Sequence, residues 1–490
     1  MSSRAQRGIS CEGRTVRHSQ EIPRCARDDR YVSGRRCKIL EARRGGSAIV
    51  LVNAVSCSSR ETLPCSRTSR RGQIGTKADI AVRGRHSTTV EAAPYIFRHA
   101  KGGWLVIKRF HVLYVGQVNL DHVGLGGTPA NDRRYDNQRL SEVFETARDV
   151  ARTMDELGYH ALWTAEHHFQ HEGYECLPNL VQLGLWLATQ TKRLKFGCAF
   201  NVLPMWHPIR LAEDYAMADI VTDGRIIMGV GRGYHSREVE TFGAPLLDAE
   251  ANRAYFEEQL ELLLKCFNEE SFHFKGKYFE CPPPVDYRGY RLKEITVVPR
   301  PKHLPVEVWM PIASGKTIDM MARHGLKAMV TLNGEKILDD VVRAYHDACA
   351  RHGRPKTLGQ DVIWGAGLYL AGSQEEAIRR VEPAHDERYK WFAPFGFVRY
   401  ADEHGRTWGT PGAPASIPTI REGVKQKAWF CGTPAEVTDG IRSIEAKYPG
   451  LEDFMIHWAE GLSPAEFKDQ LRRFAHDVMP AFAGARMAAE

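Results

Sequence analysis

The 490-residue chain contains no apolar run of about 18 residues, the length that a membrane-spanning helix needs. It also lacks a GxGxxG turn after its first predicted strand and any CxxC pair of cysteines. These absences argue against a membrane span, a dinucleotide-binding first unit and a zinc module. Residues 101–490 carry 47 basic and 52 acidic side chains, so we expect no nucleic-acid partner for this part of the chain.

Residues 1–100 have few aromatic and few acidic residues. They contain 3 of the 47 aromatic residues, no Trp, and 20 Lys and Arg against 8 Asp and Glu. Such a stretch cannot bury enough apolar area to offset about 1–2 kcal/mol of backbone entropy per residue. We interpret residues 1–104 as a low-order extension translated from a mis-assigned start codon, with the true start near Leu105 or Val106. An RNA-binding arm and a twin-arginine or lipoprotein signal at Arg43-Arg44 are less favoured interpretations.

Strand-like and helix-like patterns alternate from residue 106 to residue 480. The predicted strands are 106–118, 159–165, 194–203, 225–231, 306–312, 326–332, 362–370 and 453–458. The predicted helices are 140–157, 178–189, 208–221, 252–268, 316–324, 337–350, one from 373, one from 434, and 464–478.

Eight such βα units in about 370 residues predict an α/β fold, a (β/α)8 TIM barrel over residues 105–482 with a short tail at 483–490. Two stretches rich in Pro and aromatic residues, about 271–304 and 389–427, interrupt the alternation and are predicted insertions. A doubly wound sheet is the second choice.

Glu166, His167 and His168 follow the second predicted strand, and active sites of such barrels form where strands end and loops begin. A carboxylate and two imidazoles there suit general acid–base chemistry. Adjacent side chains of an extended segment point to opposite faces, so Glu166 and His168 should share one side and His167 should lie on the other. We see no third metal ligand at a recognisable spacing and expect no metal. Histidines that only hydrogen-bond within the loop are the alternative.

Three further strand ends carry candidate binding residues. These are Gly231, Arg232, Gly233 and Tyr234 after the fourth strand, Ser314 and Gly315 after the fifth, and Asn201 in the third. Small residues allow close backbone approach, Arg binds phosphate, and the first N–H groups of a helix bind anions. The Asn amide can contact the amide edge of a ring. Each feature alone is also compatible with an ordinary turn or helix start.

Four motifs, in this order and on these strands, resemble the bacterial-luciferase-like, flavin-dependent monooxygenases. They are EHHF at 166–169, VLPMWHPIRLAED at 202–214, GRIIMGVGRG at 224–233 and ETFG at 240–243. The resemblance implies a barrel that binds reduced FMN, O2 and a small organic substrate, with the second insertion over the site. Reduced flavin and O2 would give a C4a-hydroperoxide, whose life an apolar, water-poor pocket prolongs.

The resemblance also implies roles for single residues. His167 matches the family's catalytic histidine, and Glu166 and His168 flank it. Arg232 and Ser314 match residues that contact the flavin phosphate.

The family's non-prolyl cis peptide would fall at Ala199–Phe200, where it presents backbone to the flavin ring. Luciferases proper have Cys at the position of Gly231, so we expect no luminescence. The 166–169 loop resembles the corresponding loop of the FMN-dependent members more than that of the members that transfer hydride with deazaflavin F420. An F420-dependent enzyme stays as the alternative.

No nicotinamide fingerprint is present, so we expect a separate flavin reductase to supply the reduced FMN. We also expect a homodimer in the cytoplasm, where the scattered cysteines after residue 101 stay free thiols. Two other functions stay open. A phosphate-handling isomerase or aldolase would need a metal or a Schiff-base lysine, and Lys316 is the lysine near a strand end. A flavin-storing relative would keep the phosphate contacts without turnover.

Residues 1–104 should be dispensable, because their composition does not support a core. We expect a chain of residues 105–490 to match the full chain in melting temperature and in affinity for FMN. Calorimetry and the quenching of flavin fluorescence measure the two quantities. A large loss of either in the shorter chain would refute the mis-assigned start.

Overall fold

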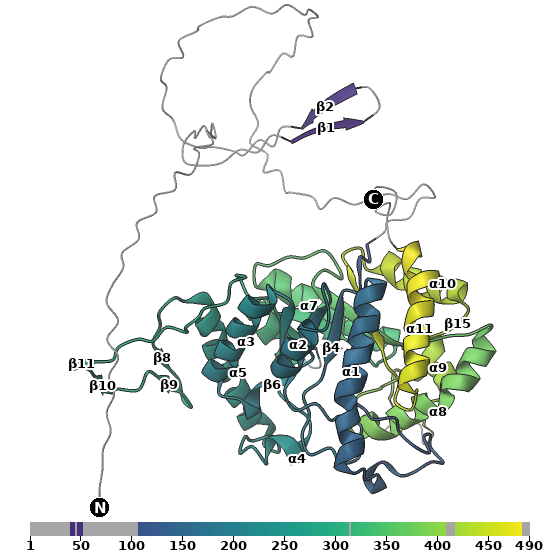
Figure 1. Ribbon diagram of the computed structural model, residues 1–490, viewed down its shortest axis with the longest axis horizontal. Coiled ribbons are helices and arrows are strands. Elements are labelled where there is room, and N and C mark those ends of the chain that lie inside the picture. The colour runs from purple at the N-terminus through teal and green to yellow at the C-terminus, as the bar shows by residue number, and fades with distance from the viewer. Residues whose placement is uncertain (1–39, 45–46, 52–105, 313–314, 408–416, 483–490) are drawn as a thin grey trace, which may run out of the picture. The chain divides into compact units, whose positions relative to one another are not determined.

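The computed structural model describes residues 40–44, 47–51, 106–312, 315–407 and 417–482 (Figure 1). The chain divides into two units, Met1–Val90 and Glu91–Glu490. In the first unit, β1 (Leu40–Arg44) pairs antiparallel with β2 (Ser47–Leu51). This hairpin lies in the stretch that we interpret as a low-order extension, and the other residues up to 105 lie outside the described part. The mis-assigned start therefore stays a prediction.

Eight parallel strands close into a barrel in the second unit, and this confirms the predicted TIM barrel. In the order in which they pair, they are β3 (Arg109–Tyr114), β4 (Ala161–Thr164), β5 (Lys195–Cys198), β7 (Ile226–Gly231), β12 (Val308–Pro311), β13 (Lys327–Val330), β14 (Val362–Leu370) and β16 (Asp453–His457). The barrel closes where β16 pairs with β3, with Phe454 opposite Phe110. Each of the eight predicted strands overlaps one of these.

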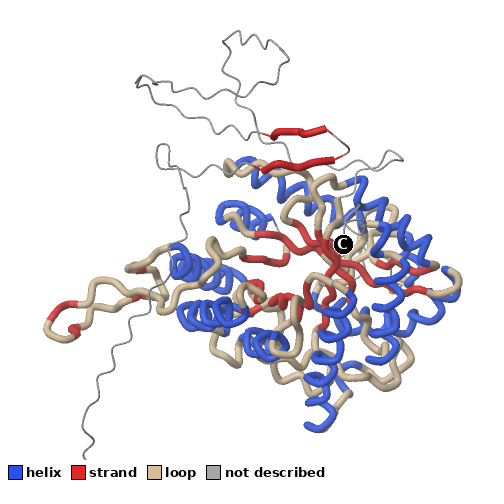
Figure 2. The backbone as a smooth tube through the Cα atoms, turned by 45° about the horizontal axis from the view of Figure 1, so that its top comes forward, coloured by secondary structure: helices blue, strands red, loops and turns tan. Residues whose placement is uncertain are grey.

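Helices surround the strands and cover the outer face of the barrel (Figure 2). The long ones are α1 (Asn137–Leu157), α2 (Leu180–Ala188), α3 (Pro208–Thr222), α5 (Ala249–Asn268), α6 (Gly315–His324), α7 (Glu335–Arg351), α8 (Gln374–Phe392), α10 (Pro434–Lys447) and α11 (Pro464–Asp477). None of the helices in the described residues is long and apolar enough to cross a membrane.

The local sequence explains where α1 begins and ends. Val143, Val150 and Met154 recur at helical spacing and are fully buried on one face. The Asp136 side chain accepts a hydrogen bond from a backbone N–H of the first turn, which caps the helix. Gly158 ends it with a φ of 80°, a left-handed conformation that glycine adopts without strain.

Two elements differ from the predicted pattern. The third predicted strand is split into β5 and β6 (Asn201–Val202), and a cis peptide joins Ala199 and Phe200 between them, as the resemblance implies. A further parallel strand, β15 (Trp429–Gly432), pairs with the C-terminal half of β14. We did not predict β15, because periodicity over four apolar residues cannot separate a short strand from a loop.

The first predicted insertion forms two short hairpins that extend beyond the barrel (Figure 1). Their strands are β8 (Phe274–Lys275) with β9 (Glu280–Cys281), and β10 (Asp286–Tyr287) with β11 (Tyr290–Arg291).

The second predicted insertion begins inside α8, so Trp391 and Phe392 lie in the last turn of this helix rather than in a loop. The turn η3 (Ala393–Phe395) follows, and α9 (Ile420–Lys425) precedes β15. Trp408, which falls within the same predicted insertion, lies outside the described residues.

Large side chains fill the interior of the barrel below its C-terminal end. Trp163 packs edge-on against Trp309, with ring centroids 5.8 Å apart. Gly197 makes room for Trp163, since a Cβ there would lie 2.2 Å from the indole. The same cluster includes Leu113 and Met329, which also line the cavity above it. The packed interior is therefore the floor of the site.

Candidate active site

A cavity of about 400 Å³ lies at the C-terminal ends of the barrel strands, a volume typical of small-molecule sites. Most of the residues predicted from the sequence line it. These are Glu166, His167, Ala199, Phe200, Gly231, Arg232, Gly233 and Tyr234. The ends of three different strands, β4, β5 and β7, thus supply one cavity, together with Phe392, Phe395 and Phe397 from α8 and the segment after it.

Asn201 does not line this cavity, contrary to its predicted contact with a ring. Its side chain is fully buried, and its Nδ2 donates a hydrogen bond to the carbonyl oxygen of Gly229 at 2.9 Å. The amide therefore ties β6 to β7, beneath the site.

The fifth strand end contributes through a residue that we did not predict. Gly315 is the first residue of α6 and does not line the cavity, and Ser314 lies outside the described residues. Thr317 is buried in the first turn of α6 and lines the cavity. Its position next to the predicted Ser-Gly helix start is the signal that could have identified it.

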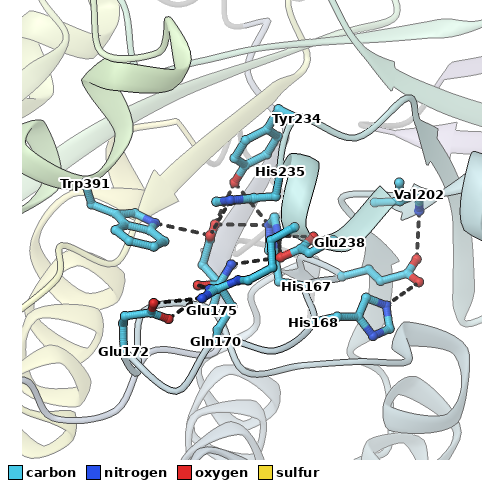
Figure 3. A network of polar contacts seen from close by, with 12 residues as sticks. His167, His168, Gln170, Glu172, Glu175, Val202, Tyr234, His235, Glu238 and Trp391 are labelled. Atoms are coloured by element: carbon cyan, nitrogen blue, oxygen red, sulfur yellow. Dashed lines mark hydrogen bonds and ion pairs between the residues drawn. The ribbon is translucent and has the colours of Figure 1, made fainter. Parts of the chain in front are cut away.

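His167 lies between two carboxylates (Figure 3). Its Nε2 is 3.0 Å from Oε1 of Glu175, and its Nδ1 is 3.3 Å from Glu238. Glu175 comes from the same loop after β4, and Glu238 from α4 (Ser236–Val239) after β7. All three side chains are buried.

The carboxylates keep His167 protonated. Burial alone lowers the pKa of His167, but the charges and hydrogen bonds of Glu175 and Glu238 outweigh it and raise this pKa to about 10. Burial raises the pKa of Glu175, and His167 and His235 outweigh that effect and hold it well below its usual range. His167 likewise outweighs burial and lowers the pKa of Glu238. At neutral pH the group is an imidazolium between two carboxylates, so His167 can donate a proton but cannot accept one.

Three further side chains hold Glu175 in place. The Tyr234 hydroxyl donates to its Oε1 at 2.7 Å and lies 3.1 Å from Nε2 of His167. Nε2 of His235 is 3.0 Å from Oε2 of Glu175, and the Trp391 indole donates to the same oxygen at 3.2 Å. The network therefore extends from the loop after β4 to α8 (Figure 3).

Glu238 is fixed from its other side by Gln170, whose Nε2 donates to it at 2.8 Å. Arg237 donates to the Gln170 oxygen at 3.1 Å and binds both oxygens of Glu172, at 2.8 and 2.9 Å. This chain of bonds holds the Glu238 carboxylate in place against His167.

Glu166 and His168 form a separate pair on the other side of the loop, which confirms the predicted alternation. Nε2 of His168 is 3.1 Å from Oε1 of Glu166. Glu166 also accepts hydrogen bonds from the Val202 backbone N–H at 2.7 Å and from the Trp206 indole at 2.9 Å. Burial raises the pKa of Glu166, and the bonds to His168 and Val202 oppose this rise. The pair joins the loop after β4 to β6.

Arg232 forms no ion pair with a described residue. Its Nη1 donates to Oδ1 of Asn252 at 3.3 Å. Burial lowers the pKa of Arg232, the charge of Arg253 lowers it further, and the more distant charge of Glu257 opposes them without reversing the shift. A partly buried guanidinium that lines a cavity and has no ion-pair partner binds an anion favourably.

The structure also brings together three potential metal ligands, which sequence spacing did not reveal. One ligand atom each from His167, His235 and Glu238 lie within 4.8 Å of one another. Both ring nitrogens of His167 already bond to carboxylates, so a metal ion there would have to replace a proton.

Besides Thr317, the sequence analysis missed the site residues Glu175, His235 and Glu238. Glu175 lies in the same strand-to-helix loop as His167. His235 and Glu238 are three residues apart, about one helical turn, directly after the fourth strand. The loops at the C-terminal end of a barrel lie next to one another, so polar residues in these loops were candidates for the active site.

The model of the luciferase-like monooxygenase family matches residues 123–449, two thirds of the chain. The chain therefore belongs to this family and is an oxidoreductase. It is 25% identical over 368 residues to the oxygenase component of the flavin-dependent trigonelline monooxygenase of Acinetobacter baylyi, covering 73% of this chain and 94% of that protein.

Two solved structures show the same fold. A monooxygenase from Streptomyces bottropensis matches with a TM-score of 0.58 and 23% identity, over 76% of this chain and 100% of that one. The oxygenating constituent of the 3,6-diketocamphane monooxygenase of Pseudomonas putida, solved in complex with FMN, matches with a TM-score of 0.59 and 17% identity, over 76% and 98%.

The protonation of His167 predicts a pH dependence of stability. Its pKa is raised from 6.5 to about 10, so its contribution to the free energy of unfolding is complete below pH 6.5 and is lost as the pH rises through 10. We expect the free energy of unfolding of the wild type to fall between about pH 6.5 and 10, and that of His167→Gln to stay flatter there. Urea unfolding at several pH values measures both, with His168→Gln as the control that keeps the wild-type slope. Parallel curves for wild type and His167→Gln would contradict the assignment.

Proposed function

We propose that this protein is the oxygenase component of a two-component monooxygenase. It would use reduced FMN and O2 to oxidise a small organic substrate, with the reduced flavin supplied by a separate reductase. The observation that carries the proposal is one cavity lined by a protonated His167 and by Arg232, which forms no ion pair with a described residue. The Acinetobacter relative is the oxygenase component of its monooxygenase, and this supports the separate reductase.

A homodimer in the cytoplasm is part of the same proposal. The six described cysteines form no disulfide, which is compatible with a reducing compartment.

The residues of the cavity fit FMN. Arg232 and Thr317 would hold its phosphate, together with Ser314 by resemblance. Phe200 and Gly231 would lie against the ring, because Gly231 has no side chain and a Cβ there would already be 3.3 Å from Phe200. Bound reduced FMN would supply the electrons for O2.

The side chains around the cavity supply protons and exclude water. His167 holds a proton on each ring nitrogen, and the Tyr234 hydroxyl beside its Nε2 also lines the cavity. These two groups can deliver a proton to oxygen as it is reduced. Phe392, Phe395 and Phe397 also line the cavity and give it an apolar surface, which keeps water away from the reacting oxygen.

Arg232→Ala should weaken FMN binding by roughly 1.5–3 kcal/mol, the usual worth of a charge-assisted hydrogen bond. It should weaken riboflavin, which has no phosphate, far less. Titrations followed by flavin fluorescence measure both ligands, and Arg210→Ala, on the exposed surface of α3, is the matched control. Equal losses for the two ligands would show that Arg232 does not contact the phosphate. Binding of F420 in place of FMN would favour the hydride-transfer alternative.

His167→Gln should slow the oxidation of bound reduced FMN by ~10²–10⁴, because the variant lacks the proton donor. Its FMN affinity should stay within about tenfold of the wild type, since the phosphate contacts come from other strands. Stopped-flow absorbance after mixing with O2 measures the rate, and His168→Gln should lose much less. A wild-type rate in His167→Gln would refute the catalytic assignment and leave the flavin-binding proposal standing.

A further inference from the structure

The acidic residues that line the cavity are all bound to other groups of the protein. Glu175 pairs with His167, and Glu166 accepts hydrogen bonds from its own neighbours. Glu460 pairs with Arg388, whose Nε donates to it at 2.7 Å, and both side chains are buried. No acid among the described lining residues is left to neutralise a further cation.

Arg399 is a second guanidinium in this wall without a carboxylate partner. It is half-buried and lines the cavity, and its terminal nitrogens form no hydrogen bond or ion pair with a described residue. Burial lowers its pKa, and no carboxylate of a described residue opposes this effect. Residues 408–416 of the same insertion, which lie outside the described part, contain neither Asp nor Glu.

Arg399 is held in place by the end of β13. Its backbone N–H donates to Oδ1 of Asn333 at 2.9 Å, and its carbonyl oxygen accepts from the Gly334 N–H at 2.9 Å. The Asn333 amide in turn donates to the carbonyl oxygen of Thr331 at 2.9 Å. The guanidinium is thus presented to the cavity from a fixed backbone rather than from a free surface loop.

We infer that Arg399 binds a carboxylate of the substrate, so that this enzyme acts on small organic acids. The inference rests on the proposed function, in which the phosphate of FMN neutralises Arg232 and leaves Arg399 without an anion. A guanidinium binds a carboxylate through two parallel N–H donors, and partial burial strengthens the pair. Phe392, Phe395 and Phe397 line the same wall, so the body of the acid is an aromatic ring or an alkyl chain.

Calorimetric titration of the full chain with benzoate and hexanoate, each against its neutral amide, tests the inference. We expect at least one acid to bind the wild type about tenfold or more tightly than its amide. Arg399→Gln should remove this preference, and Arg399→Lys should keep part of it because the charge remains. Arg232→Gln is the matched control, which should weaken FMN and keep the preference for the acid. Each titration is made with and without saturating FMN.

Equal affinity of the wild type for acid and amide would overturn the inference, as would an unchanged preference in Arg399→Gln. It would also be overturned if Arg399→Gln lost FMN affinity more than about tenfold but kept riboflavin affinity, because Arg399 would then contact the cofactor phosphate. Failure of the proposed function appears separately, as absent FMN binding to the wild type. The titrations of Arg232→Gln without FMN still report on Arg399, because Arg232 can then no longer bind the acid.

Discussion

The ion pairs of His167 with Glu175 and Glu238 are the interaction on which the rest of the site depends. A buried charge without a partner costs several kcal/mol, so three such groups are stable only together. They come from the loop after β4 and from α4 after β7, and Trp391 links them to α8. Keeping these charges paired holds three elements in one arrangement. The same pairing keeps a proton on the imidazole at neutral pH.

The cavity is lined by two kinds of charged group, those paired with each other and those without an ion-pair partner. The cluster around His167 is internally paired, whereas Arg232 and Arg399 form no ion pair with a described residue. Aromatic side chains line the same cavity and limit its contact with water, which strengthens any electrostatic contact inside. Anionic groups of a bound molecule can therefore bind to the two guanidinium groups, and its neutral part can pack against the apolar side chains.

Most of the barrel could be predicted from the sequence, because each βα unit repeats its pattern locally. The buried face of α1 and its Asp136 and Gly158 ends are visible in the residues themselves. The splitting of the third strand and the added β15 were not predicted from periodicity. Both are pairings of very short segments, and pairing depends on the neighbouring strand rather than on the segment.

The sequence by itself determined which residues stand at strand ends, and so it identified Glu166, His167, His168 and Arg232. It also determined that Glu166 and His168 share a side, since this follows from the geometry of an extended chain. Only the tertiary structure decided what faces these residues. Glu238 is 71 residues from His167. The barrel's closure brings such distant loops together, and no local pattern in the loops encodes which of them will meet.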